Sequence, residues 1–283
     1  MQAFDTRQVA GTLREQVVQA HRALQARTPL VQCITNVVSA NHMANVLLAA
    51  GASPAMVDNT QEAALFAGVA DALLINLGTP NDAQVESMRL AAEAAQAAGK
   101  PWVLDPVGAG ALPWRGGVAL ELLRFQPSAI RGNPSEIMGL SGLGKGGRGV
   151  DSADEPAAAV PAALDLLKHS PVVCASGVVD HLVGSHAGRQ VLVRVFGGSP
   201  LQPKVTATGC ALGALLAAYQ AVAEPLVAAL AAHASFAIAG ALAARRHSAP
   251  GSFAVAFIDE LFRLDAASFR ERMKLEVAPF ESV

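Results

Sequence analysis

The chain has 283 residues, of which 52% are apolar and 16% are charged, and its 21 basic and 23 acidic residues give a net charge of −2. This composition excludes disorder along most of the length, and it argues against sequence-independent nucleic-acid binding, which needs a strongly cationic surface. The length fits one large domain or two small ones. No linker rich in proline, serine or charge divides the sequence, so we expect a single domain over residues 1–283.

The amino-terminal sequence carries charges within its first seven residues and has no apolar segment, so it does not resemble a secretory signal. The three cysteines, Cys33, Cys174 and Cys210, are an odd number without C-x-x-C spacing. That pattern argues against a disulfide framework or a structural zinc site and favours a reducing compartment. We therefore expect a cytoplasmic protein.

Short apolar runs alternate with longer helical patterns in the first two thirds of the chain. The expected strands are Leu30–Thr35, Ser53–Val57, Ala72–Asn76, Trp102–Asp105, Ala129–Arg131 and Val172–Ala175. Between them lie helical patterns such as Asn41–Ala50 and Asp82–Gly99. Strands and helices that alternate in this way predict an α/β fold whose mainly parallel central sheet is flanked by helices on both faces.

The pattern changes after Ser176. Two strands, His181–Ser185 and Gln190–Phe196, flank a short turn and predict an antiparallel hairpin, and the stretch from Thr208 to Leu264 is almost entirely helical. Within it, 205–223 and 225–244 contain no charged residue and approach the length that spans a bilayer. Alanine dominates both, so we interpret them as buried helices of a protein that does not associate with membranes.

A glycine-rich stretch at 139–149 contains parts of two phosphate-loop patterns. Gly139, Gly144 and Lys145 match most of a Walker A loop. However, Gly146 stands where a serine or threonine must supply a hydroxyl to Mg²⁺. The spacing of the glycines in the stretch also matches a dinucleotide-binding fingerprint. Because neither pattern follows a predicted strand, we interpret the stretch as a flexible loop. The histidines have no metal-ligand spacing, and His233, in an apolar helix, is expected to be a core residue.

The sharpest local feature is the segment Lys204–Cys210, which opens a long apolar helix. Free N–H groups at a helix start favour an anion, and the helix dipole favours a thiolate at Cys210. The alternative is an ordinary helix start, with Thr206 or Thr208 as the capping residue and Cys210 as core filler. The residues alone leave both interpretations open.

Charged residues also follow two neighbouring strands. Asp105 leaves one strand for a glycine-bearing loop, and Arg131 and Glu136 lie at the end of the next. Ligands of open α/β sheets bind at that edge, where a carboxylate holds Mg²⁺ through water and an arginine holds phosphate. Together with the helix start, these groups indicate phosphoryl transfer.

At this point the sequence resembles the hydroxyethylthiazole kinases, thiamine-salvage enzymes with a ribokinase-like fold. The matching segments keep their order over nearly the whole chain: PLVQCITN (29–36), ANVLLAAGASPAMV (44–57), ALLINLGT (72–79), LDPVGAGA (104–111), AIRGNPSEI (129–137), KVTATGCAL (204–212) and PGSF (250–253). The resemblance implies transfer of the ATP γ-phosphate to the primary hydroxyl of 4-methyl-5-(2-hydroxyethyl)thiazole. It also implies Mg²⁺ and a homotrimer with active sites between subunits.

The resemblance also assigns roles to individual residues. Met56 is expected to contact the thiazole with Asn36 close by, and Arg131 and Ser176 to contact ATP, the serine replacing the usual threonine. Asp105 and Glu136 match the acidic positions associated with Mg²⁺ and phosphate. The transferring phosphoryl group would be stabilised by main-chain N–H groups of about residues 207–210, which include Ala207, Thr208, Gly209 and Cys210. Cys210, characteristic of these kinases, would accept or orient the substrate proton.

Two positions depart from the family pattern. Ala207 replaces a glycine at a position assigned to substrate contact, and its methyl group costs more if φ there is positive. Val178 replaces an acid, while Asp180 is kept. Two rival functions remain: a hydrolase or acyltransferase with Cys210 as nucleophile, which needs a histidine partner, and a nucleotide- or thiazole-binding homologue without turnover.

Overall fold

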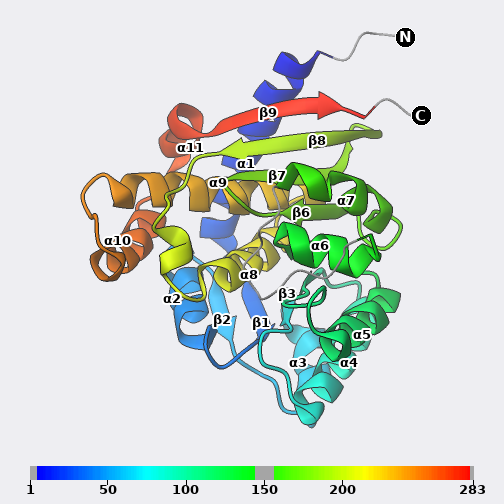
Figure 1. The fold of residues 1–283 in the computed structure, drawn as a ribbon. Helices are drawn as coiled ribbons and strands as arrows, with labels where there is room; N and C mark the ends of the chain where they lie inside the picture. Colours follow the sequence, from blue (N-terminus) through cyan, green and yellow to red (C-terminus); the bar gives the residue numbers. More distant parts are fainter. Residues whose placement is uncertain (1–4, 144–155, 281–283) are drawn as a thin grey trace.

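The computed structural model describes residues 5–143 and 156–280, and it is built around one nine-stranded sheet (Figure 1). The strands are β1 (Leu30–Ile34), β2 (Ser53–Ala55), β3 (Ala72–Asn76), β4 (Trp102–Asp105), β5 (Ala129–Gly132), β6 (Val172–Ala175), β7 (Val179–His186), β8 (Arg189–Phe196) and β9 (Lys274–Pro279). The helices are α1 (Thr6–Arg27), α2 (Ala40–Ala50), α3 (Ala63–Val69), α4 (Asp82–Ala97), α5 (Pro113–Leu122), α6 (Pro134–Ser141), α7 (Val160–Leu166), α8 (Thr208–Gln220), α9 (Pro225–Ala244), α10 (Pro250–Phe262) and α11 (Ala266–Arg272).

The strands lie in the order β2-β1-β3-β4-β5-β6-β7-β8-β9. The first six run parallel, and β7, β8 and β9 each pair antiparallel with the preceding strand. The expected mainly parallel sheet and the expected hairpin are therefore both confirmed. Because the six parallel strands end at the same edge, the loops after β1 to β6 meet there.

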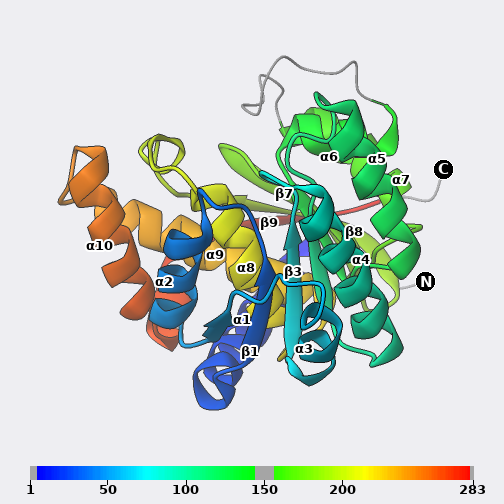
Figure 2. The same ribbon diagram turned by 90° about the horizontal axis from the view of Figure 1, so that it is seen from below.

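Two apolar layers cover the sheet. Along β3, Leu73 and Ile75 face one layer and Leu74 faces the other, as the two-residue period of a strand requires. Figure 2 shows α1, α2, α8, α9 and α10 on one side of the sheet and α3 to α7 on the other. Strands buried on both faces are mostly apolar, which is why these runs could be recognised in the sequence.

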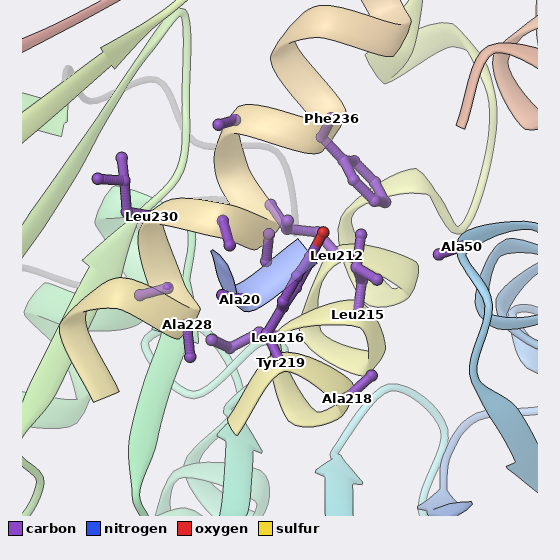
Figure 3. Packing of buried hydrophobic residues seen from close by; sticks show 14 of the residues in the cluster. Ala20, Ala50, Leu212, Leu215, Leu216, Ala218, Tyr219, Ala228, Leu230 and Phe236 are labelled. Atoms are coloured by element: carbon purple, nitrogen blue, oxygen red, sulfur yellow. The ribbon is translucent and has the colours of Figure 1, made fainter. Parts of the chain in front are cut away.

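Helices α8 and α9 form the centre of the larger layer, where Leu212, Leu216 and Tyr219 of α8 pack beside Leu230 and Phe236 of α9 (Figure 3). Helix α9 is the one helix of the described chain that is long and apolar enough to cross a membrane, but 83% of its most apolar window is buried inside the protein. Its small alanine side chains allow close packing against neighbouring helices. The sequence-based interpretation of this segment as a buried helix is confirmed.

The sequence analysis missed α1 and β9, which pack against each other in the layer that also contains α9 and α11. Helix α1 begins after Asp5, whose carboxylate accepts hydrogen bonds from the N–H groups of Arg7 and Gln8. Of the glycine-rich stretch, Gly139 lies in α6 and Gly142 ends that helix with φ of 78°. The flexible-loop interpretation is therefore wrong for 139–141, which are helical. Residues 144–149 lie outside the described residues, so the interpretation stays a prediction there.

Candidate active site

Polar side chains follow one another along the carboxyl edge of the parallel strands. Asn36 lies two residues beyond β1, Asn76 and Asp105 end β3 and β4, Arg131 lies within β5, and Ser176 directly follows β6. Since the strands lie side by side in this order, the five residues form a row in space. The sequence predicted four of them as site residues and missed Asn76. The sequence feature that could have identified Asn76 is an amide at the end of an otherwise apolar strand.

Hydrogen bonds join this row into a continuous chain. Asn36 Nδ2 donates to Asn76 Oδ1 over 2.7 Å, and Asn76 Nδ2 donates to Asp105 Oδ2 over 2.7 Å. Arg131 Nη1 lies 3.5 Å from Asp105 Oδ2, and Arg131 Nε donates to Ser176 Oγ over 3.0 Å. The residues expected to serve the thiazole and those expected to serve ATP therefore belong to one polar network.

Cys210 meets this row from α8, where Asn36 Nδ2 donates to its sulfur over 3.5 Å. The side chain is half-buried, and burial raises the pKa of the Cys210 thiol, with a further rise from the nearby Asp105 carboxylate. The thiolate favoured by the helix-start argument is therefore not the resting form at neutral pH. Burial outweighs the helix dipole, an effect that the sequence could not reveal.

The start of α8 has no side-chain cap. Its N-cap residue is Ala207, and Thr208 lies inside the helix, where its hydroxyl donates to the carbonyl oxygen of Val205 over 2.7 Å. The alternative with Thr206 or Thr208 as the cap is therefore wrong. With no capping side chain, the first turn of the helix can direct its main-chain N–H groups to an anion.

Ala207 adopts φ of 70° and ψ of −5°, in the left-handed region that glycine occupies most readily. A positive φ is the more costly possibility for an alanine in place of the family's glycine, because its Cβ then clashes with the backbone. The other departure, Val178, has a side chain that is 91% exposed.

Two glycines let α8 approach the sheet edge closely. A Cβ on Gly209 would lie 3.2 Å from Arg131 Nη2, and a Cβ on Gly213 would lie 3.4 Å from Asp105 Oδ2. The helix start thus lies directly against the buried ion pair of Asp105 and Arg131. A Cβ at Gly209 would require the Arg131 guanidinium or the helix to shift by a few tenths of an ångström.

Glu136 is a buried carboxylate that joins two loops. Its Oε2 accepts from the main-chain N–H of Asn133 over 2.8 Å, and its Oε1 accepts from that of Gly108 over 3.0 Å. Burial raises the pKa of Glu136 to about 7, and the nearby Asp105 carboxylate adds to the rise. Burial likewise raises the pKa of Asp105 to about 6, although Arg131 and Asn76 oppose it.

These carboxylates fit a divalent cation. Asp105 Oδ1 is buried without a hydrogen-bond partner among the described residues, and a bound cation or its water would satisfy it. Across the described ranges, no group of three or more histidine, cysteine, aspartate or glutamate side chains is close enough to form a metal site. Mg²⁺ binds to one or two carboxylates together with water and substrate phosphates, so a pair of carboxylates fits it.

The remaining predicted residues lie at the two ends of the row. Met56 directly follows β2, at the β1 end, and its side chain is 37% exposed. Near the β6 end, His233 is fully buried, as expected of a core residue, and its Nδ1 lies 2.8 Å from Asp180 Oδ2. Asp180 Oδ1 accepts from the N–H of Gly177, so this pair holds the loop that carries Ser176.

An open hollow of about 700 Å³ lies at the opposite end of the sheet, where β4, β5 and β6 begin. Two of the polar side chains there bind within the protein: Lys168 pairs with Asp165, and Gln220 donates to the carbonyl oxygen of Pro225. The buried carboxylates and the uncapped helix start are at the other edge. The chemistry therefore identifies the carboxyl edge as the candidate active site.

Comparisons with known proteins agree over most of the chain. The model of the hydroxyethylthiazole kinase family matches residues 21–267. A hydroxyethylthiazole kinase of Rhodococcus erythropolis is 56% identical over 264 residues, which cover 93% of this chain and 94% of that protein. One of Acinetobacter baumannii is 52% identical over 255 residues, which cover 90% and 92%.

Solved structures agree with the fold. The hydroxyethylthiazole kinase protein of Pyrococcus horikoshii superimposes with a TM-score of 0.84 at 36% identity, covering 93% of this chain and 99% of that one. A pyridoxal kinase of Staphylococcus aureus has a TM-score of 0.60 at 14% identity, covering 89% and 98%, which shows a shared ribokinase-like fold alone. On the strength of the matched family model and these relatives, the chain belongs to the hydroxyethylthiazole kinase family.

Proposed function

We propose that this kinase transfers the γ-phosphate of ATP to the primary hydroxyl of 4-methyl-5-(2-hydroxyethyl)thiazole at the carboxyl edge of its parallel sheet. The observation that carries this site is the polar row from Asn36 to Ser176, which faces the uncapped start of α8. The thiazole lies toward the β1 and β2 end, against Met56 and Asn36. ATP lies toward the β5 and β6 end, against Arg131 and Ser176.

The chain's own groups mainly position and neutralise charge in this reaction. Main-chain N–H groups of residues 207–210 stabilise the transferring phosphoryl group, because a loose transition state carries its charge on the equatorial oxygens. Cys210, a thiol in its resting form, orients the hydroxyl of the substrate. Such a transition state needs little early deprotonation of the nucleophile, so a thiol with a raised pKa is sufficient.

Asp105 and Glu136 would hold Mg²⁺, through water, beside the phosphates. The metal supplies electrostatic neutralisation of the phosphate oxygens when it is bound. Its charge would also favour the ionised form of both buried carboxylates, whose pKa values are raised in its absence. Asp105 Oδ1, which has no partner in the described protein, is the oxygen best suited to this role.

The cysteine-dependent hydrolase finds no support. Such a nucleophile needs a base within hydrogen-bond reach, and the hydrogen-bond partner described for the Cys210 sulfur is the Asn36 amide rather than a histidine. A thiol whose pKa is raised is also a weak nucleophile. Thiazole-dependent release of ADP distinguishes a kinase from a nucleotide- or thiazole-binding protein without turnover.

The decisive experiment is a coupled ADP-release assay with Mg·ATP and three acceptor conditions: the hydroxyethylthiazole, hydroxymethylpyrimidine and no acceptor. We expect release that depends on the thiazole. Equal release without any acceptor, preference for the pyrimidine, or ATP binding without thiazole-dependent release would contradict the proposal. A thioester or ester substrate that labels Cys210 without ATP would favour the hydrolase.

We further propose a single kinase domain over residues 1–283 that acts in the cytoplasm as a homotrimer with active sites between subunits. Val37 and Val38, directly after Asn36, are 82% and 58% exposed. Exposed apolar side chains at the edge of a site are suited to cover by a neighbouring subunit. Light scattering after size-exclusion chromatography would measure the mass, for which we expect three chains.

A further inference from the structure

Asn76 lies between Asn36 and Asp105 in the polar row, yet nothing in the proposed reaction assigns it a role. It ends β3 between the strands that carry Asn36 and Asp105, and it is fully buried. It bonds to side chains on both sides, at 2.7 Å in each case. Asparagine in the middle of a sheet costs free energy unless its amide is fully satisfied, so its presence there calls for a reason.

Main-chain groups fix the orientation of both amides in this part of the row. The N–H of Gly78 donates to Asn76 Oδ1 over 3.0 Å, and the N–H of Ser39 donates to Asn36 Oδ1 over 3.0 Å. Because a main-chain N–H can only donate, these two positions must be carbonyl oxygens. The NH₂ groups of Asn36 and Asn76 therefore face the interior of the site.

The Asn36 amide links Asn76 to the sulfur of Cys210. One hydrogen of Asn36 Nδ2 is donated to Asn76 Oδ1 over 2.7 Å, and the other is donated to the Cys210 sulfur over 3.5 Å. An amide NH₂ cannot accept a hydrogen bond, so the thiol proton of Cys210 has to point away from Asn36. The NH₂ group of Asn76 donates to Asp105 Oδ2.

We propose that Asn76 is a positioning residue, which holds the Cys210 sulfur and the Asp105 carboxylate in a fixed relation so that the acceptor hydroxyl and the nucleotide phosphates are aligned. This inference rests on the proposed function, because it assigns Cys210 to the acceptor side and Asp105 to the phosphate side. Asn76 acts through these two groups and contacts neither substrate.

The test uses the full-length enzyme with two isosteric variants, Asn76→Leu and Asn76→Asp. Leucine removes both the acceptor for Asn36 and the donor to Asp105, whereas aspartate keeps the shape but replaces the donating NH₂ with an acceptor. The first readout is steady-state kinetics with both substrates. The second is the rate at which iodoacetamide alkylates Cys210 at a fixed mildly alkaline pH, followed by peptide mass spectrometry. The nearly inaccessible Cys33 and Cys174, at 1% and 0% exposure, serve as internal references.

We expect kcat to fall at least tenfold in both variants, with both KM values within about threefold of wild type, since only the alignment of bound groups is lost. Alkylation of Cys210 should slow several-fold in Asn76→Leu, because the Asn36 amide that donates to the sulfur loses the partner that fixes it, and more in Asn76→Asp, which adds a carboxylate to the site. If Asn76→Leu fails to fold, the aspartate variant carries the test.

Tyr219→Phe is the matched control. It removes a buried hydroxyl that bonds to His21 and Ser235 and that lies in the last turn of α8, well beyond Cys210. It should lower thermal stability without changing kcat or the alkylation rate. An unchanged alkylation rate in both Asn76 variants, with or without a loss of kcat, would overturn the proposal. Failure of the proposed function is distinguishable, because wild type would then lack thiazole-dependent ADP release while the alkylation differences persist.

Discussion

Asp105 and Arg131 form a buried ion pair across β4 and β5, with Arg131 Nη1 3.5 Å from Asp105 Oδ2. The Arg131 side chain is 9% exposed and the Asp105 side chain is 0% exposed. Neither charge stands alone: Asn76 donates to the carboxylate, and the guanidinium donates to Ser176. Burying two charges is costly, and a buried pair often adds little net stability. Its retention at the carboxyl edge therefore points to function, namely a fixed positive charge beside the phosphates.

Removing one partner of this pair should be far more damaging than removing one partner of a surface pair. For Arg131→Met we expect a loss of about 3–5 kcal/mol in the free energy of unfolding, because the Asp105 charge is left without its partner. Arg89→Met is the control, since its pair with Glu121, at 2.8 Å, is about one third exposed and should contribute below about 1 kcal/mol. Urea unfolding of both variants measures the difference, and equal losses would contradict the assignment of a buried pair.

Cys210 and Met56 should affect different kinetic constants. For Cys210→Ala we expect kcat to fall by about 10–100-fold with little change in KM, because a group that orients the reacting hydroxyl acts mainly in the transition state. For Met56→Ala we expect the thiazole KM to rise several-fold while kcat and the ATP KM stay near wild type. Steady-state assays with each substrate varied in turn would test both, and full kcat in Cys210→Ala would remove its proton role.

Much of this arrangement was predictable because buried parallel strands are short apolar runs. Polar residues at their carboxyl ends, such as Asp105 and Arg131, are then conspicuous in the sequence. Asn76 was missed because a single amide completes an apolar run without a charge to mark it. Its importance depends on which strands lie beside β3, and strand order is a property of the tertiary fold.

The remaining errors concern local geometry and burial. Thr208 had the right residue type for a helix cap, but a left-handed residue, Ala207, precedes it, so α8 begins one position earlier than a threonine cap would allow. Cys210 stands at a helix start, where a thiolate is favoured, yet its burial and the nearby Asp105 carboxylate raise the pKa of its thiol. Neither backbone φ nor side-chain burial can be derived from the residue type alone.

His21 should make the stability of the fold depend on pH. It is buried, its Nδ1 lies 3.1 Å from the Tyr219 hydroxyl, and its Nε2 donates to the carbonyl oxygen of Leu264 over 3.0 Å. Burial lowers the pKa of His21 from its ordinary value of 6.5. The unfolded chain then binds more protons than the folded one near pH 6, so this stabilising contribution is complete above about pH 6.5 and is lost as the pH falls below it.

The measurement is urea unfolding of wild type and His21→Gln from pH 5.5 to 7.5. We expect the stability difference between wild type and variant to shrink as the pH falls. Asp105 and Glu136, whose pKa values are raised, titrate in the opposite sense, and His42, whose pKa is lowered by burial, titrates in the same sense. All three are present in both proteins, so they largely cancel in the difference. A difference that does not change with pH would refute the role of His21.

Ala207 offers a substitution that should improve the enzyme in two respects. An alanine in the left-handed region costs roughly 1–2 kcal/mol, and replacing it with glycine removes this cost. The greater conformational freedom of glycine in the unfolded chain offsets about 0.4–1 kcal/mol of that gain. Ala207→Gly should therefore stabilise the protein by up to about 1 kcal/mol. Ala207 is also the residue at the start of α8 that is expected to contact the thiazole. Removing its methyl group should therefore lower the thiazole KM and leave the ATP KM unchanged.

Ala187 provides the matched control, since it has φ of 49° in the turn between β7 and β8, which carries no proposed site residue. Ala187→Gly should give a similar rise in stability by thermal unfolding, with all kinetic constants unchanged. The contrast between the two variants separates relief of backbone strain from an effect on the substrate pocket. If Ala207→Gly gained stability but kept the wild-type thiazole KM, the methyl group would contribute strain alone, and the substrate contact proposed for position 207 would have to be abandoned.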